Sequence, residues 1–203
     1  MDQATLKYYA QNANVVAARY ESIASKLSES FGIAFKANSR ILDVGCGSGR
    51  DLVALSALGH DCYGIDGTAE FVTLSQQIHP ELVGRIAHIA LPDGAIPFGG
   101  NFDAVLCSAV LMHLPIEQLA PSAVFIRRSL KPGGRLLYSV PSKRSDVNET
   151  QRDEYGRLFL ADSAERLQRV FEDVGFELIN QWIEADSLGR GSVQWLSVLM
   201  ELQ

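Results

Sequence analysis

The residues best suited to chemistry are a glycine-rich run and a carboxylate that follows it. The run DVGCGSG occupies 43–49, directly after a short apolar stretch, and Asp66 stands 21 positions after Gly45. Glycines let the backbone approach a ligand closely, and the first amides of a following helix are free to bind one. An acidic residue at the end of the next strand can accept hydrogen bonds from ribose hydroxyls. The pattern therefore predicts a nucleoside-binding site.

Two ligand classes compete for this run. A dinucleotide site prefers the spacing G-x-G-x-x-G, whereas Gly45, Gly47 and Gly49 stand at G-x-G-x-G. Asp43, two residues before the first glycine, would repel a phosphate. The same carboxylate suits a cationic ligand that carries a free amino group. The spacing therefore favours a cationic nucleoside over a pyrophosphate.

The elements that must position these residues can be predicted from periodicity. Seven apolar runs are typical of strands, at 41–44, 62–65, 85–90, 102–107, 135–140, 176–183 and 193–201. Helical spacing falls between most of them. Such alternation implies a parallel, doubly wound sheet, and the last connection is too short for a crossover helix. We expect an α/β fold whose mostly parallel seven-stranded sheet ends in an antiparallel hairpin, with ligands at the carboxyl ends of the strands.

Local signals make the expected boundaries more specific. Apolar residues spaced by three or four predict one amphipathic helix over 4–28. Pro121 is expected in the first turn of a helix that ends near Leu130, and 131–134 (KPGG) is expected to form a tight turn. The run 162–165 (DSAE) resembles a capping box with Asp in the cap position.

Composition limits the class of protein. The chain has 203 residues, 47% of them hydrophobic, and a net charge of −6, which suits one globular domain over 1–203. Its three cysteines form no CxxC pair, so neither a disulfide scaffold nor a metal site is expected. We find no export signal and no apolar run long enough to span a membrane. We therefore expect a cytoplasmic protein that binds neither membrane nor nucleic acid.

Four ordered motifs carry a family resemblance. ILDVGCGSG, YGIDGTAEFV, NFDAVLCSAVLMHL and LKPGGRLLYSV follow one another between residues 39 and 141. They resemble the motifs of class I S-adenosylmethionine-dependent methyltransferases of the small-molecule type. The resemblance implies a Rossmann-like methyltransferase fold, the cofactor S-adenosyl-L-methionine, an N-terminal lid helix within 1–30 and a substrate-side insertion at 141–160.

The resemblance also implies a cofactor site. Its residues would be Tyr9, Arg19, Asp43, Gly45, Cys46, Gly47, Gly49, Asp66, Gly67, Thr68, Leu91, Asp93 and Ser108. The glycine-rich run would line the methionine moiety, Asp43 would lie near its amino group, and Asp66 would hold the ribose. Gly67 and Thr68 would border the adenine, and the backbone of Ser108 would face the methionine end.

Two places depart from the family pattern. Many relatives have an acidic residue directly after the third strand, where simple counting puts Pro92 here. Either Asp93 serves from a shifted loop or Leu91 contacts the adenine through its backbone. In the N-terminal segment, Val16 replaces a tyrosine that is common there. Tyr9 and Arg19 are expected to reach the methionine carboxylate, unless the segment is an ordinary amphipathic helix.

Little side-chain chemistry is needed for methyl transfer. The sulfonium activates its methyl group for in-line displacement, so the protein supplies alignment and a dry site. His113 is the candidate general base, because an imidazole exchanges protons near neutral pH; alternatively it only bonds to the backbone of its loop. Substrate contacts are expected from Met112, Tyr155, Arg157 and Arg190, whose guanidinium groups suit an anionic acceptor.

Other methyltransferase classes lack their signatures here. The chain reads CSAV at 107–110, where enzymes that methylate amino groups of DNA have an Asn/Asp-Pro-Pro-aromatic tetrad. It also lacks the Pro-Cys pair that provides the nucleophile of cytosine-C5 methyltransferases. A small-molecule acceptor is therefore expected. The alternatives are a non-catalytic module that binds S-adenosylmethionine and a nicotinamide-dependent oxidoreductase. Binding measurements with a panel of cofactors distinguish the oxidoreductase from the two alternatives that bind S-adenosylmethionine.

Overall fold

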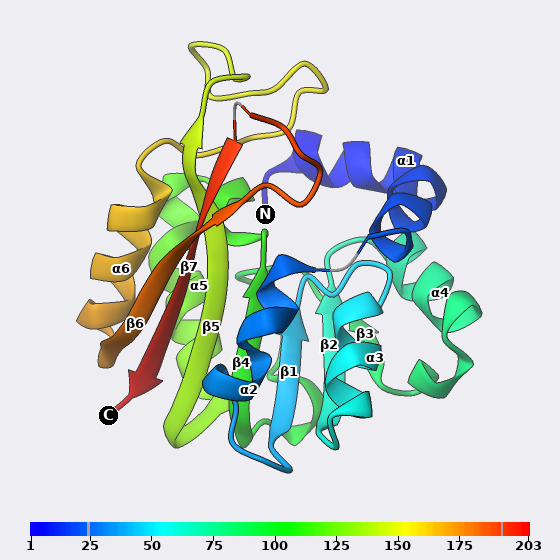
Figure 1. Cartoon of the computed structure of the whole chain (residues 1–203), viewed down its shortest axis with the longest axis vertical. Coiled ribbons are helices and arrows are strands. Elements are labelled where there is room, and N and C mark those ends of the chain that lie inside the picture. Colours follow the sequence, from blue (N-terminus) through cyan, green and yellow to red (C-terminus); the bar gives the residue numbers. More distant parts are fainter. Residues whose placement is uncertain (24, 192) are drawn as a thin grey trace.

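A single seven-stranded sheet organises the protein. The computed structural model describes residues 1–23, 25–191 and 193–203. The strands are β1 (Arg40–Val44), β2 (Asp61–Asp66), β3 (Ile86–His88), β4 (Phe102–Ser108), β5 (Leu130–Arg144), β6 (Phe176–Ala185) and β7 (Val193–Leu202). Their order in the sheet is β3-β2-β1-β4-β5-β7-β6 (Figure 1). The order reverses between β1 and β4, which is where such sheets bind ligands.

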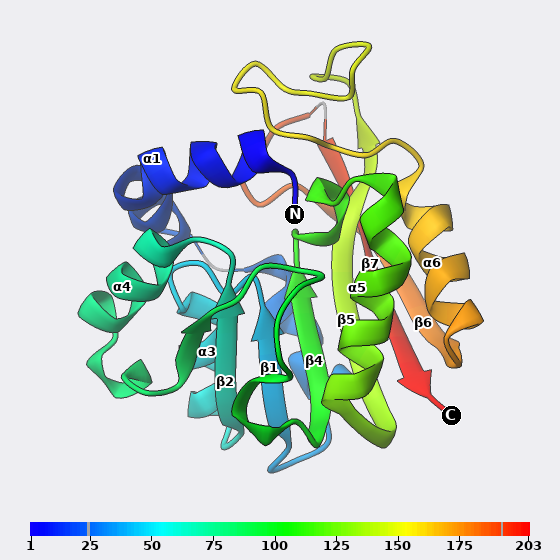
Figure 2. The same ribbon diagram turned by 180° about the vertical axis from the view of Figure 1, so that it is seen from behind.

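Helices cover both faces of the sheet and one end. In the described part of the chain they are α1 (Gln3–Glu21), α2 (Phe31–Ala34), α3 (Arg50–Ala57), α4 (Ala69–Ile78), α5 (Ile116–Ser129) and α6 (Ser163–Asp173). Short 3-10 helices accompany them, η1 (Lys26–Ser30), η2 (Pro80–Leu82), η3 (Pro97–Gly99) and η4 (Leu111–His113). Figure 2 shows α5 and α6 against one face, with α2 and α3 behind the sheet. Helix α1 crosses the carboxyl ends of the strands in both views.

The predicted fold class is confirmed. Strands β1 to β5 pair in parallel. Strand β7 runs antiparallel to both β5 and β6, so the last two strands form the expected hairpin. No helix in the described part of the chain is both long and apolar enough to cross a membrane.

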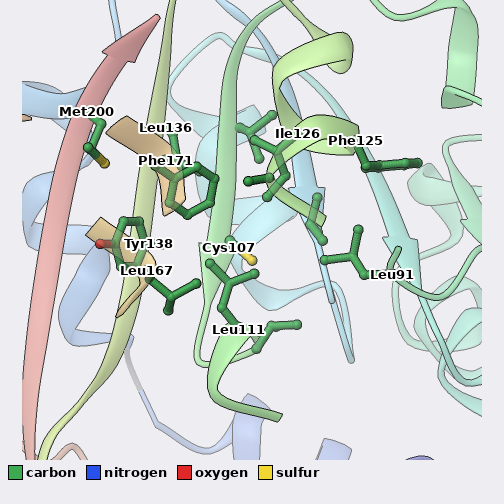
Figure 3. Packing of buried hydrophobic residues seen from close by; sticks show 14 of the residues in the cluster. Leu91, Cys107, Leu111, Phe125, Ile126, Leu136, Tyr138, Leu167, Phe171 and Met200 are labelled. Carbon is green, nitrogen blue, oxygen red and sulfur yellow. The ribbon is translucent and has the colours of Figure 1, made fainter. Parts of the chain in front are cut away.

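Strand β4 is apolar from Ala104 to Cys107 because both of its faces are covered there. Val105 and Cys107 point into the hydrophobic cluster beneath α5 and α6, and Ala104 and Leu106 point into the cluster beneath α2 and α3. Figure 3 shows the first cluster between β5 and the two helices. The alternation of a strand explains why neighbouring residues enter different clusters.

The helix expected over 4–28 is shorter than predicted. Helix α1 ends at Glu21, and a separate 3-10 helix follows. The Ser22 hydroxyl donates to the Arg19 carbonyl and the Ser28 hydroxyl to that of Ser25, and serine bonds of this kind compete with helix continuation. Ala24, an apolar residue within the predicted range 4–28, lies outside the described residues.

Three local predictions were wrong. Helix α5 begins at Ile116, which puts Pro121 inside the helix rather than in its first turn. The expected turn at 131–134 belongs to β5, where it forms an irregularity in the pairing with β4. Asp162 is the N-cap residue of α6, as predicted, but the expected capping box is absent: the residue is left-handed with φ 52°, and its side chain makes no capping hydrogen bond.

Candidate functional site

A large cavity lies at the carboxyl ends of the strands. It has a volume of about 240 Å³ and is lined by residues that follow β1, β2, β4, β5 and β6. Helix α1 and the segment 145–162 contribute its roof, and this segment is tied to η4 by the Leu160 N–H, which donates to the Met112 carbonyl at 2.9 Å. The cavity occupies the position predicted from the strand order.

The glycine-rich turn is held tightly against β2. The amides of Gly45 and Cys46 both donate to the Ile65 carbonyl, at 2.7 and 3.1 Å. Gly45 has φ +75°, and a Cβ atom on it would lie 2.3 Å from Cγ2 of Val110. Glycine is therefore required at this position by its dihedral angle and by the loop that follows β4.

Asp66 joins the ends of β1 and β2. Its Oδ2 accepts the Gly47 amide at 3.0 Å, and its Oδ1 accepts the amide and hydroxyl of Thr68 at 2.8 and 2.6 Å. Burial raises the pKa of Asp66, while these hydrogen bonds oppose the rise. A carboxylate offers about four acceptor positions, so Oδ2 keeps capacity for a ligand hydroxyl.

A second carboxylate lies beneath the turn, and one of its oxygens accepts no hydrogen bond from the described part of the chain. Asp43 is 2% exposed, and its Oδ1 has no hydrogen-bond partner among the described residues. Burial, followed by the charges of Asp51 and Asp66, raises the pKa of Asp43 well above its usual range. Arg50 offsets this only partly, because its Nε is paired with Asp51 at 2.9 Å. This end of the cavity therefore favours a cation.

Helix α1 brings aromatic and basic side chains over the cavity. The Tyr9 hydroxyl lies 3.3 Å from Nε2 of His113 and accepts from Nη1 of Arg157 at 3.2 Å. Tyr20 and Arg19 line the far side of the same roof. The helix is tied down at its start, because Arg152 forms two hydrogen bonds with Asp2 at 3.0 and 2.9 Å.

His113 is buried at the centre of this network. Its Nδ1 lies 2.5 Å from the Leu158 carbonyl, which can only accept, so Nδ1 carries the proton. Nε2 then presents its lone pair to the Tyr9 hydroxyl. Burial lowers the pKa of His113 to about 4. The imidazole is therefore neutral at pH 7 and is a weak base.

Most of the predicted site residues line this one cavity. They are Tyr9, Arg19, Asp43, Gly45, Cys46, Gly47, Asp66, Gly67, Thr68, Ser108, Met112, His113, Arg157 and Arg190. Their assignment to cofactor, catalysis or substrate stays a prediction, and the structure brings them together around a shared space.

Four predicted residues do not line the cavity. Gly49 lies behind the turn, where a Cβ atom would meet Leu82 at 2.6 Å. Leu91 is buried in the core (Figure 3), and Asp93 is exposed in the loop after β3. Tyr155 is 56% exposed. These side chains are directed to packing or to solvent, which motif spacing alone does not reveal.

Several lining residues were not predicted individually as site residues. They include Tyr20, Asp51, Phe71, Ser139, Arg144, Phe159, Asp186 and Trp195. Arg144 and Phe159 lie within the insertion at 141–160 that was predicted on the substrate side. Asp51 follows the glycine-rich run directly, and its position in the first helical turn was an available signal. Trp195 reaches the cavity because it pairs with Pro141 across the β5–β7 ladder, a long-range contact that no local pattern encodes.

Comparison with known proteins identifies the family. A family described as "Methyltransferase domain" matches residues 15–181. The match spans more than half of the chain, so the protein belongs to this methyltransferase domain family. The predicted family resemblance is thereby confirmed.

Individual relatives are more distant. The mitochondrial ubiquinone biosynthesis O-methyltransferase of Schizosaccharomyces pombe is 28% identical over 154 residues, which cover 74% of this chain and 52% of that protein. The chain thus spans about half the length of the curated relatives it matches.

Solved structures share the fold. One is the 1,6-didemethyltoxoflavin-N1-methyltransferase of Burkholderia thailandensis with bound 1,6-didemethyltoxoflavin and S-adenosylhomocysteine (TM-score 0.74, 17% identity, 98% of this chain and 88% of that one). Another is the [4+2]-cyclase SpnF (TM-score 0.75, 17% identity, 97% and 94%). Because two differently named activities share this fold, the fold does not by itself define the reaction.

Proposed function

We propose that the protein transfers a methyl group from S-adenosylmethionine to a small-molecule acceptor. The observation that carries the proposal is the unsatisfied, buried carboxylate of Asp43 beside Asp66, at the carboxyl ends of β1 and β2. A cationic nucleoside supplies what this end of the cavity lacks, a positive charge and ribose hydroxyls. A pyrophosphate would add further negative charge beside carboxylates.

The residues present fit the cofactor. Asp66 would accept ribose hydroxyls on Oδ2, and the glycine-rich turn would lie along the methionine moiety, with Asp43 near its amino group. Arg19, which has no ion pair with another described residue, and Tyr20 would hold the methionine carboxylate from α1. Bound S-adenosylmethionine supplies a methyl group that its sulfonium has already activated for displacement.

The protein's own contribution is alignment and exclusion of water. The roof formed by α1 and 145–162 is pinned by contacts on both sides of His113. With Nδ1 engaged, Nε2 of His113 can exchange the Tyr9 hydroxyl for a hydrogen bond from the acceptor. A base with a pKa of about 4 deprotonates only acidic groups efficiently at pH 7. The site therefore favours acceptors whose nucleophile ionises readily or carries no proton.

The name of the S. pombe relative favours an oxygen nucleophile among these acceptors. The S. pombe relative is named an O-methyltransferase. An acidic hydroxyl, such as a phenol, combines an oxygen nucleophile with easy ionisation. We propose a hydroxyl of this kind as the methyl acceptor.

Product formation tests the proposal. Purified protein is incubated with S-adenosylmethionine and a small-metabolite fraction, and S-adenosylhomocysteine is quantified by mass spectrometry. We expect release above the protein-free rate, a loss of at least tenfold in Asp66→Ala, and little change in Asp61→Ala. Asp61 lies at the other end of the same strand and is a matched control. Tight cofactor binding without any release would instead indicate a non-catalytic module.

A further inference from the structure

Three arginines line the cavity from elements other than the two strands, β1 and β2, that carry Asp43 and Asp66. Arg144 ends β5, Arg157 lies in 145–162, and Arg190 lies in the turn between β6 and β7. All three line the same cavity, and burial, followed by the charges of Arg157 and Arg190, lowers the pKa of Arg144. Guanidinium groups gathered in one cavity offer the hydrogen-bond donors that an anionic ligand needs.

Each arginine is held in place by an aspartate. Arg157 donates to Oδ2 of Asp153 through Nε and Nη2, at 2.8 and 2.6 Å. Arg190 holds Asp186 with two bonds of 2.9 and 2.7 Å. These aspartates fix the guanidinium planes before any ligand arrives, which lowers the entropic cost of binding.

Arg144 completes the set with a third acidic partner. Its Nη2 donates to Oδ2 of Asp146 at 3.0 Å, whereas its Nε lies 2.6 Å from Oδ1 as an ion pair without hydrogen-bond geometry. Neither Arg144 nor Arg190 uses its Nη1 in a hydrogen bond with a described residue. Two cavity-lining arginines therefore have N–H donors available for a ligand.

The charge of the cluster indicates the charge of its ligand. Three arginines and three aspartates sum to about zero, so a monoanion disturbs the balance less than a dianion does. A carboxylate also matches the planar geometry of guanidinium donors. These considerations favour a carboxylate over a phosphate monoester.

Aromatic side chains form the wall next to these donors. The Arg144 guanidinium lies 3.4 Å from the centroid of the Phe159 ring. Trp195 lines the same space, and its Nε1 donates to Oδ1 of Asp186 at 2.9 Å. Tyr9 closes the side toward His113. Flat aromatic faces beside fixed donors suit a planar, partly apolar ligand.

We propose that this arginine cluster is the acceptor subsite and that it binds the carboxylate of a planar aromatic acid. The inference rests on the proposed methyl transfer, because it treats the ligand as the methyl acceptor. It concerns a different anion from the methionine carboxylate, which we assign to α1. The acid would lie along Phe159 and Trp195, with its other end directed toward His113.

Matched ligands separate this inference from the proposed function. Protein saturated with S-adenosylhomocysteine is titrated calorimetrically with a set of aromatic carboxylic acids and the corresponding primary amides. We expect several acids to bind roughly 10- to 100-fold more tightly than their amides, as charge-assisted hydrogen bonds predict. Arg144→Gln and Arg190→Gln should abolish that preference. Arg166→Gln, an arginine on α6 outside the cavity, should retain it.

The affinity for S-adenosylhomocysteine distinguishes the outcomes. Variants that keep this affinity within twofold are folded around an intact cofactor site. Arg190→Lys provides a second check, because it preserves the charge beside Asp186 and should keep part of the preference. If S-adenosylhomocysteine binds but no acid binds, or if acids and amides bind equally, the subsite proposal is overturned while the proposed function stands. If S-adenosylhomocysteine itself does not bind, the proposed function is overturned, and the subsite proposal that rests on it falls as well.

Discussion

The burial of neutral His113 makes the stability of the protein depend on pH. The folded state holds the pKa of His113 at about 4, against an ordinary value of 6.5, because burial penalises the charged ring. The unfolded chain therefore binds more protons between pH 6.5 and 4. Stability attributable to His113 is fully present above pH 6.5 and is lost as the pH falls toward 4.

The size of this effect follows from the two pKa values. Their difference of about 2.5 corresponds to about 3 kcal/mol once both states are fully protonated. Between pH 7 and pH 5 the unfolded histidine becomes charged while the folded one stays neutral. Linkage then predicts a loss of about 2 kcal/mol over this interval.

Urea unfolding of paired variants isolates the contribution of His113. His113→Asn retains a donor for the Leu158 carbonyl but cannot titrate, so its stability should fall by about 2 kcal/mol less than that of the wild type between pH 7 and pH 5. His88→Asn removes an exposed histidine and should follow the wild type. If wild type and His113→Asn lose the same free energy, the argument from burial is refuted.

Two further predictions concern the turn around the first strand. Asp43→Asn should weaken S-adenosylmethionine binding about 10- to 100-fold, because the variant cannot offer a negative charge to the amino group, and calorimetric titration measures this change. Gly45→Ala should cost roughly 1–3 kcal/mol more stability than Gly84→Ala, since both glycines have positive φ but only Gly45 faces Val110. Equal costs in thermal unfolding would contradict the clash.

The architecture was predictable because each strand carries its own apolar signal. Strand β4 is apolar on both faces and is therefore read directly as a central strand. The ends of the helices were less predictable, since side-chain hydrogen bonds to the backbone compete with the hydrogen bonds that continue a helix. The serines after Glu21 end α1 although the apolar spacing continues, and Pro115 precedes α5 so that Pro121 falls within it.

The cofactor half of the site was more predictable than the acceptor half. Gly45 and Asp66 belong to turns whose sequence signal is local, and they meet because β1 and β2 are adjacent. Arg144 and Trp195 meet only through the antiparallel pairing of β5 with β7. Phe159 arrives from a segment with little regular structure. Contacts of such long range leave no pattern in any one stretch of sequence.

Calorimetric titration with S-adenosylhomocysteine and NAD tests the central claim most directly. If the cavity is an S-adenosylmethionine site, S-adenosylhomocysteine should bind with micromolar affinity to the wild type and to Asp61→Ala and at least tenfold more weakly to Asp66→Ala, and NAD should not bind. Binding of NAD in place of S-adenosylhomocysteine, or unchanged affinity in Asp66→Ala, would contradict it.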